Sequence, residues 1–343
     1  MKSLVLTAEH KSAAGDSPKI KLVLRDSPKP VPKPDELLIK TGASLICTSD
    51  INDIRGDSFG IQLPVILGHE GAGTVEEAGA GTKGFRAGDE VSAHPVVPCY
   101  SCEACRRGYP HLCDNMVHLG IDRGGTFAEY FTIRADRARL KPASIDFTSA
   151  ALMEPVCVCM EAVERANIPE GGTVLIAGDG PFGIIIANLC VSVKRAKTIL
   201  LGRHAFRMGH ADGAINLTEG PDSPADIMDV SGGGVDSAVL CVGNDTALNT
   251  CIGTLRPRGT LSVFSAIHGL ARADMLRVHI KELNICGSCN DMGYLDDALA
   301  WLATGAADKI VTHRYSLDDF ETAFDTAANR KSEALKVAFT AFK

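Results

Sequence analysis

The chain carries two different hydrophobic patterns, and the change between them lies near Pro155. From Leu37 to about Phe131, short apolar runs are interrupted by Gly and Pro, as in residues 36–40 and 88–92, which is typical of strands joined by turns. Beyond Pro155, β-branched apolar runs alternate with helical stretches. Such alternation predicts a parallel sheet covered on both faces. The pattern therefore predicts a β-rich lobe followed by an α/β domain.

The α/β domain has six predicted strands. They lie at residues 173–177, 198–201, 215–217, 238–242, 260–264 and 284–286. The longest apolar stretch, Phe182 to Val193, is a predicted helix between the first two strands, and Asn188 and Ser192 interrupt it, so it does not have the composition of a membrane span.

Composition fits two packed domains and a small-molecule partner. The chain has 343 residues, of which 45% are hydrophobic and 22% charged, a balance typical of globular proteins. The net charge of -7 is modest and the basic residues are dispersed, so neither nucleic acid nor an acidic membrane surface is indicated. The apolar run at residues 4–6 is too short for a signal peptide, and we expect a cytoplasmic protein.

Four of the twelve cysteines form a C-x2-C-x2-C-x7-C cluster, at Cys99, Cys102, Cys105 and Cys113. Four thiolates satisfy a tetrahedral zinc whose role is structural. Disulfides and a nucleic-acid-binding zinc module are the alternatives, but Glu103 and Asp114 offset the basic Arg106 and Arg107. A zinc that stabilises the loop is the favoured interpretation.

The other cysteines divide into one candidate ligand and seven buried side chains. Cys47 stands far upstream of the cluster and is followed by His69 and Glu70, residue types that suit a catalytic zinc with an open coordination position. The remaining seven lie among apolar or small residues, where a cysteine usually packs as a compact hydrophobe. They are Cys157, Cys159, Cys190, Cys241, Cys251, Cys286 and Cys289.

A Gly-rich turn between the first predicted strand and the helix indicates dinucleotide binding. Its sequence is Gly178-Asp179-Gly180-Pro181-Phe182-Gly183, a GxGxxG pattern in the required strand-turn-helix context. The glycines let the backbone approach a pyrophosphate, which lies at the N-terminus of the following helix. The predicted contacts come from Gly178, Gly180, Pro181, Phe182 and Gly183.

These motifs together resemble those of medium-chain zinc-dependent alcohol dehydrogenases, most closely the sorbitol (polyol) and threonine dehydrogenase branch. The resemblance covers nearly the whole chain and is carried by residues 68–75, 99–113, 124–130, 154–155 and 178–183. It implies a GroES-like β-rich catalytic domain at residues 1–155 and 290–343, and a Rossmann doubly wound parallel-sheet domain at 156–289. Helices over 294–305 and 319–329 are expected after the chain returns to the first domain, with substrate between the domains.

The resemblance also implies two zincs per chain and a set of catalytic residues. Cys47, His69 and Glu70 match the ligands of the catalytic zinc, and Glu154 matches a carboxylate that ligates it directly or through its water. Glu154 has the alternative role of capping a helix that starts near Val156. Such a zinc lowers the pKa of the substrate hydroxyl.

Ser49 matches the hydroxyl that takes the substrate proton, and the family pattern is interrupted beyond it. Asn52 stands where many relatives carry a histidine that ends the proton relay, and an amide does not titrate near neutral pH. The relay then ends either at cofactor ribose hydroxyls and water or at another acid such as Asp53.

The end of the second α/β strand bears on which dinucleotide binds. NAD-specific relatives place an acid there for the ribose 2′-hydroxyl, whereas this chain has Gly202 followed by Arg203. Arg203, helped by Arg207, is suited to a 2′-phosphate, so NADP is favoured over NAD. The alternative is that Arg203 is a solvated surface charge and NAD binds through its pyrophosphate.

The predicted function is the oxidation of a secondary alcohol, a polyol or sugar derivative, and the reverse reduction. Two alternatives are an amino-alcohol dehydrogenase of the threonine type and a non-catalytic protein that binds zinc and a dinucleotide. The resemblance further implies a homo-oligomer, either a dimer or a tetramer.

Overall fold

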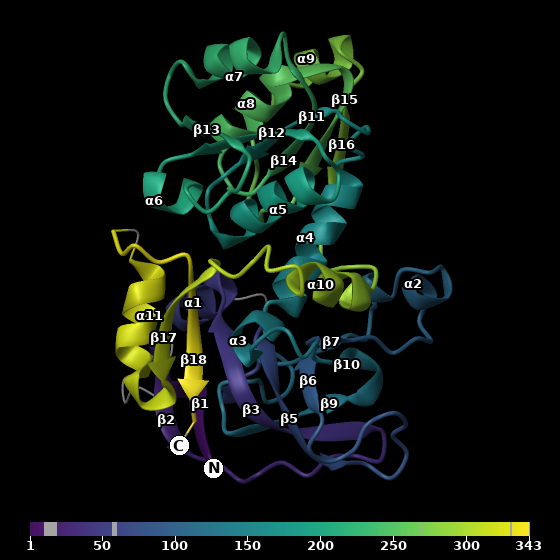
Figure 1. Ribbon diagram of the computed structural model, residues 1–343, viewed down its shortest axis with the longest axis vertical. Coiled ribbons are helices and arrows are strands. Elements are labelled where there is room, and N and C mark those ends of the chain that lie inside the picture. The colour runs from purple at the N-terminus through teal and green to yellow at the C-terminus, as the bar shows by residue number, and fades with distance from the viewer. Residues whose placement is uncertain (10–18, 57–59, 268, 330, 343) are drawn as a thin grey trace, which may run out of the picture. The chain divides into compact units, whose positions relative to one another are not determined.

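The computed structural model describes residues 1–9, 19–56, 60–267, 269–329 and 331–342, and its chain divides into two compact units (Figure 1). The first unit consists of Met1–Glu154 and Leu295–Lys343, and the second of Pro155–Tyr294. The first unit is discontinuous because the chain leaves it and returns. The sequence-based division at residues 155/156 and 289/290 differs from these bounds by one and five residues.

The first unit contains a seven-stranded sheet, a three-stranded sheet and a two-stranded sheet. Its path is β10-β6-β5-β3-β18-β17, with β9 also paired to β3; the smaller sheets are β2-β1-β4 and β7-β8. The strands are β1 (Lys2–Glu9), β2 (Lys19–Asp26), β3 (Glu36–Ile46), β4 (Val65–Ile66), β5 (Glu70–Ala78), β6 (Glu90–Ala93), β7 (Val96–Val97), β8 (Val117–His118), β9 (Tyr130–Arg134), β10 (Ala138–Leu140), β17 (Val311–Ser316) and β18 (Lys336–Ala341).

Short helices connect these strands. They are α1 (Thr48–Arg55), α2 (Glu103–Arg106), α3 (Phe147–Ala150), α10 (Leu295–Leu302) and α11 (Phe320–Ala328), with 3₁₀ turns η1 (Pro110–Leu112), η2 (Ala135–Arg137) and η3 (Leu317–Asp319). The longer α4 (Met153–Arg165) begins at the division between the units.

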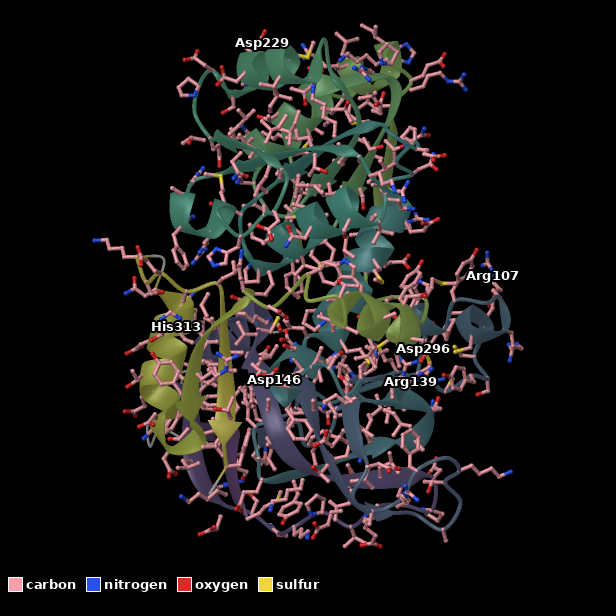
Figure 2. The ribbon with its side chains drawn as sticks, viewed as in Figure 1. Arg107, Arg139, Asp146, Asp229, Asp296 and His313 are labelled. Atoms are coloured by element: carbon pink, nitrogen blue, oxygen red, sulfur yellow. The ribbon has the colours of Figure 1, made fainter. Side chains whose placement is uncertain are left out.

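The returning segment is tied into the first unit by strand pairing and by an ion pair. Strand β18 pairs antiparallel with β3, with Val337 opposite Ile46. Arg139 on β10 lies 2.9 Å from the carboxylate of Asp296 on α10, and the two side chains are neighbours in Figure 2. Helices α10 and α11 fall within the stretches where the resemblance predicts helices.

The second unit is a six-stranded parallel sheet with helices between its strands. Its strands are β11 (Thr173–Ala177), β12 (Lys197–Gly202), β13 (Ile215–Thr218), β14 (Val235–Leu240), β15 (Leu255–Val263) and β16 (Asn284–Gly287). Its further helices are α5 (Pro181–Ser192), α6 (Ala205–Met208), α7 (Ser223–Ser231), α8 (Asp245–Thr254) and α9 (Met275–Ile280). The order β13-β12-β11-β14-β15-β16 places the first strand at the centre. The predicted Rossmann fold is confirmed, although β14 and β15 begin earlier than the apolar runs indicate.

Burial explains the continuous apolar runs of this unit. The inner strands β11 and β12 contribute fully buried Leu175 and Ile199, because helices cover both faces of a parallel sheet. In the described part of the chain, no helix is both long enough and apolar enough to cross a membrane.

Candidate active site

Cys47 is placed where strand β3 turns into helix α1. It is the N-cap of α1, with extended backbone, and the carboxylate of Asp50 accepts a hydrogen bond from its backbone N–H at 2.8 Å. This reciprocal cap holds the Cys47 thiol at the end of a buried strand.

Strand pairing brings His69 and Glu70 to the same place. Glu70 begins β5 directly opposite Leu45 on β3, two residues before Cys47. Gly68 precedes them with φ of 91°, and a side chain there would meet the ring of Phe127. One ligand atom from each of Cys47, His69 and Glu70 lies within 4.8 Å of the others, and all three residues are buried.

The imidazole of His69 is oriented by an acid. Its Nδ1 lies 3.4 Å from Oδ1 of Asp50, which leaves Nε2 for a metal, as in many carboxylate–histidine–metal arrangements. Burial by itself lowers the pKa of His69, but the Asp50 charge and hydrogen bonds to Asp50 and Cys47 raise the pKa well above its usual value. His69 would hold a metal ion through Nε2 in place of that proton.

One oxygen of the Glu70 carboxylate is hydrogen-bonded and the other, within the described part of the chain, is not. Its Oε1 accepts a hydrogen bond of 2.6 Å from the ammonium of Lys336, while the buried Oε2 has no hydrogen-bond partner among the described residues. Burial lowers the pKa of Lys336, but the charges of Glu70 and Cys47 outweigh it and raise the pKa above its ordinary value. The orphaned oxygen beside a thiol and an imidazole fits the donor set of a zinc ion.

The other predicted catalytic residues are Ser49 and Glu154. The Ser49 hydroxyl lies 3.5 Å from Nε2 of His69. Glu154 is buried but lies outside the set of mutually close ligand atoms, although its charge acts on Lys336. Helix α4 begins at Met153 rather than near Val156, so Glu154 belongs to its first turn and does not cap it.

Two further side chains near the set have shifted pKa values. Burial and the neighbouring Asp50 raise the pKa of Asp53 to about 6. His118 lies edge-on to His69, with ring centroids 5.5 Å apart, and burial together with the charge of His69 lowers its pKa to about 3. His118 is therefore neutral near pH 7, and it donates through Nδ1 to the carbonyl of Leu119 at 2.7 Å.

The four-cysteine lobe forms a closed sulfur cluster. The sulfurs of Cys99, Cys102, Cys105 and Cys113 all lie within 4.8 Å of one another, and none is in a disulfide. The Ser101 hydroxyl and the backbone N–H groups of Ser101 and Cys102 donate to Cys99 and lower the pKa of its thiol to about 5. This arrangement suits thiolates that share one zinc ion.

The Gly-rich turn lies at the carboxyl end of β11, where the strand order of the sheet reverses. A Cβ on Gly183 would come within 1.9 Å of the Gly178 carbonyl, so α5 packs this closely only with glycine. Gly180 is the N-cap of α5, has no side-chain cap bond, and faces open space within 4 Å of its missing Cβ. The turn therefore fits a pyrophosphate, with Pro181 in the first turn of α5 and the Phe182 ring against Phe264.

The residues predicted to bind a 2′-phosphate are placed differently from one another. The guanidinium of Arg203 is paired with Glu219, at 2.7 and 2.8 Å. Arg207 lies on the short helix α6 and is half-buried. Gly202 is buried at the end of β12, beside the carboxylate of Asp179.

Comparisons with known proteins agree with both units. The family described as "Alcohol dehydrogenase GroES-like domain" matches residues 33–143, and the one described as "Zinc-binding dehydrogenase" matches residues 189–304. The sorbitol dehydrogenase of Bacillus subtilis is 32% identical over 320 residues, which is 88% of this chain and 89% of that protein. The chain belongs to the medium-chain zinc-dependent alcohol dehydrogenase family. It is thus a zinc-dependent, NAD(P)-dependent dehydrogenase acting on CH–OH donors.

Further relatives show how wide this branch is. An L-threonine 3-dehydrogenase of Shewanella baltica is 31% identical over 323 residues, covering 90% of this chain and 94% of that one. A putative zinc-binding dehydrogenase from Sinorhizobium meliloti, solved with NADP, superposes with a TM-score of 0.86 at 27% identity, over 98% of this chain and 99% of that one.

Some residues of this dehydrogenase's site were not found from its sequence. Asp50 could have been found, because it is the fourth residue of the Cys47-Thr-Ser-Asp50 cap and this spacing predicts a helix start. Lys336 had no such signal, since it is a single lysine in an apolar strand. One prediction was wrong: the Cys289 side chain is exposed rather than packed as a buried hydrophobe, because it follows the edge strand β16.

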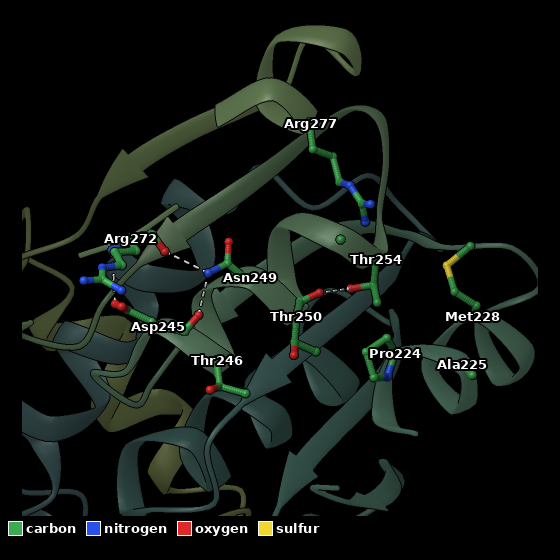
Figure 3. A pocket seen from close by; sticks show the side chains of 11 residues that line it. Pro224, Ala225, Met228, Asp245, Thr246, Asn249, Thr250, Thr254, Arg272 and Arg277 are labelled. Atoms are coloured by element: carbon green, nitrogen blue, oxygen red, sulfur yellow. Dashed lines mark hydrogen bonds between the residues drawn. The ribbon is translucent and has the colours of Figure 1, made fainter. Parts of the chain in front are cut away.

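A separate groove of about 750 Å³ lies in the second unit, lined by α7, α8, α9 and the segment before α9 (Figure 3). The amide of Asn249 donates to the carbonyls of Asp245 and Arg272, both at 2.8 Å, and closes one side of the groove. None of the residues predicted to bind cofactor lines it.

Proposed function

We propose that this dehydrogenase oxidises a secondary alcohol of the polyol or sugar-derivative class and catalyses the reverse reduction. The observation that carries the proposal is the buried set of Cys47, His69 and Glu70 with the Ser49 hydroxyl beside it. Such a set offers thiolate, imidazole and carboxylate donors to one ion and leaves a neighbouring hydroxyl for proton transfer.

The residues of the site divide into ligands, orienting groups and a proton acceptor. A zinc ion held by Cys47, His69 and Glu70 would supply Lewis acidity that lowers the pKa of the substrate hydroxyl. Asp50 holds the tautomer and orientation of His69, and Lys336 holds Glu70 in place. Ser49 accepts the alcohol proton and passes it on. Glu154, which lies outside the close set, would ligate the ion directly or through its water.

Two relatives of this chain support different classes of substrate. A sorbitol dehydrogenase at 32% identity supports a polyol, and Glu154 at the position that the polyol branch uses for a carboxylate adds to that support. A threonine dehydrogenase at 31% identity supports an amino alcohol as the second candidate.

A substrate panel tests the proposal. Polyols, sugar phosphates, threonine and simple alcohols are assayed by the absorbance of the reduced nicotinamide, with both NAD⁺ and NADP⁺. We expect the highest kcat/KM with a polyol or sugar derivative. A panel in which threonine exceeds every polyol would establish the second candidate instead.

The cofactor is a nicotinamide dinucleotide held by the Gly-rich turn. The sequence favours NADP because Arg203 follows Gly202, and a relative at 27% identity was solved with NADP. The pairing of Arg203 with Glu219 and the Asp179 carboxylate beside Gly202 support NAD. The twelve cysteines, all free of disulfides, suit a reducing compartment such as the cytoplasm.

We further propose a homo-oligomer that pairs through the edge of the parallel sheet. Strand β16 ends the sheet and has one described neighbour, and its Ile285 is 41% exposed. Leu276 and Ile280 on the preceding α9 are each 69% exposed. An exposed edge strand near exposed apolar side chains is suited to pairing with a second copy.

Sedimentation velocity tests the oligomer. Ile285→Lys introduces a charge on the edge strand and should dissociate the oligomer at micromolar concentration. Met228→Lys on α7, where the side chain is 38% exposed, is the matched control. A native protein that sediments as a monomer would contradict this proposal.

A further inference from the structure

The end of strand β12 is the position at which a Rossmann domain recognises the adenosine ribose. An acid at this position accepts the ribose 2′-hydroxyl in NAD-binding proteins. In this chain the position holds Gly202, which has no side chain to offer. A different carboxylate occupies the space. A Cβ built on Gly202 would lie 2.5 Å from Cβ and 2.7 Å from Oδ2 of Asp179.

Asp179 belongs to the Gly-rich turn and is fixed over the end of β12. Its Oδ2 accepts hydrogen bonds from the backbone N–H groups of Arg203 at 2.7 Å and His204 at 2.6 Å. The His204 ring adds contacts from Nδ1 at 3.0 Å to Oδ2 and 3.2 Å to Oδ1. The side chain is therefore ordered, and Oδ1 keeps most of its capacity to accept.

Arg203 is directed elsewhere by the register of the sheet. Gly202 pairs with Thr218 on β13, so the residues that follow, Arg203 and Glu219, are neighbours. The guanidinium makes two parallel hydrogen bonds to the Glu219 carboxylate, a geometry that favours a stable pair. Binding a 2′-phosphate with Arg203 would require breaking this pair.

We propose that Asp179 takes the role of the missing acid at the end of β12 and selects NAD over NADP. This inference rests on the proposed function, because it concerns the same dinucleotide site. Oδ1 of Asp179 accepts the 2′-hydroxyl of NAD, while its negative charge repels a 2′-phosphate. Glu219 neutralises the cation that would otherwise attract the phosphate. The turn that approaches the pyrophosphate thus also recognises the ribose.

Calorimetric titration of the zinc-loaded protein with NAD⁺ and NADP⁺ tests the inference without turnover. The native protein should bind NAD⁺ at least about tenfold more tightly than NADP⁺, a difference of about 1.4 kcal/mol. Asp179→Asn keeps the size and one backbone acceptor but removes the charge, and it should reduce this ratio by about tenfold. Glu219→Gln should tighten NADP⁺ several-fold by releasing Arg203, whereas Arg203→Ala should leave the native ratio within about twofold.

Thermal unfolding of each variant separates selectivity from loss of fold, since Asp179 also holds the backbone after β12. Asp179→Ser, whose hydroxyl still accepts one N–H, replaces the Asn variant if the latter is not recovered folded. Tighter native binding of NADP⁺, or an unchanged ratio in a folded Asp179 variant, would overturn the inference and leave the proposed function intact. Binding of neither nucleotide would contradict both.

Discussion

The ammonium of Lys336 lies 2.6 Å from Oε1 of Glu70, and both side chains are buried, at 3% and 0% exposed. The two residues are 266 positions apart in the chain. The pair joins the returning strand β18 to β5 at the candidate zinc site, and the charge of each side chain compensates the other.

Replacing Lys336 should destabilise the protein. In protein stripped of zinc, Lys336→Met leaves the Glu70 carboxylate buried without a cation, and the loss of one member of such a pair costs about 3 kcal/mol of unfolding free energy. Lys336→Arg should lose much less, because the charge is kept. The control is Lys194→Met, which breaks a pair with Glu164 whose side chains are 32% and 64% exposed. That loss should stay below about 1 kcal/mol in urea unfolding, and equal losses at both sites would show that the buried pair is not special.

We expect two zincs per chain with separable roles. Cys47→Ser should lose the catalytic zinc and all turnover, with little change in the unfolding midpoint. Cys102→Ser should lose the structural zinc, and its first effect should be a lower unfolding midpoint. Elemental analysis measures the zinc content per chain of each variant. Cys289→Ser, which removes an exposed thiol, serves as the control. Fewer than two zincs in fresh, fully active native protein would refute this prediction.

Ser49→Ala should reduce kcat/KM far more than Asn52→Ala. The Ser49 hydroxyl lies beside His69, and removal of a group that transfers the reacting proton costs about 10²- to 10⁴-fold. Steady-state kinetics of both variants decide the order, with Thr48→Ala, at an exposed neighbour, as the matched control. A larger loss in Asn52→Ala would mean that the relay starts elsewhere.

Stability should depend on pH through Asp53. Its pKa is raised to about 6 in the folded protein, so the folded state binds this proton more tightly than the unfolded state does. Asp53 therefore destabilises the fold increasingly as pH rises from its unfolded pKa to about 6, and this cost is fully present above pH 6. Asp53→Asn removes the cost.

Urea unfolding at two pH values checks the sign. The stability advantage of Asp53→Asn over the native protein should be about 1 kcal/mol larger at pH 7.5 than at about pH 5. Asp229→Asn, on the exposed surface of α7 (Figure 2), controls for the loss of a carboxylate. An advantage that shrinks as pH rises would contradict the raised pKa.

Features that depend on neighbouring residues were readable in the sequence. The four-cysteine lobe spans fifteen positions, from Cys99 to Cys113, and its spacing alone predicts a shared ion. The Gly-rich turn was equally local, because its strand and helix flank it directly. The alternation of apolar runs predicted the parallel sheet, since each buried strand must be apolar on both faces.

What only the tertiary structure decided are the partners of those residues. The sequence indicates Arg203 as a phosphate ligand by its charge, but the pairing of β12 with β13 places Arg203 in an ion pair with Glu219. The sequence shows Gly202 where NAD-binding relatives have an acid, but the fold of the Gly-rich turn places the Asp179 carboxylate beside Gly202. Lys336 reaches Glu70 because β18 pairs with β3, which in turn pairs with β5. The physical reason is that a charge acts over a few ångströms, and those distances are set by strand register rather than by separation along the chain.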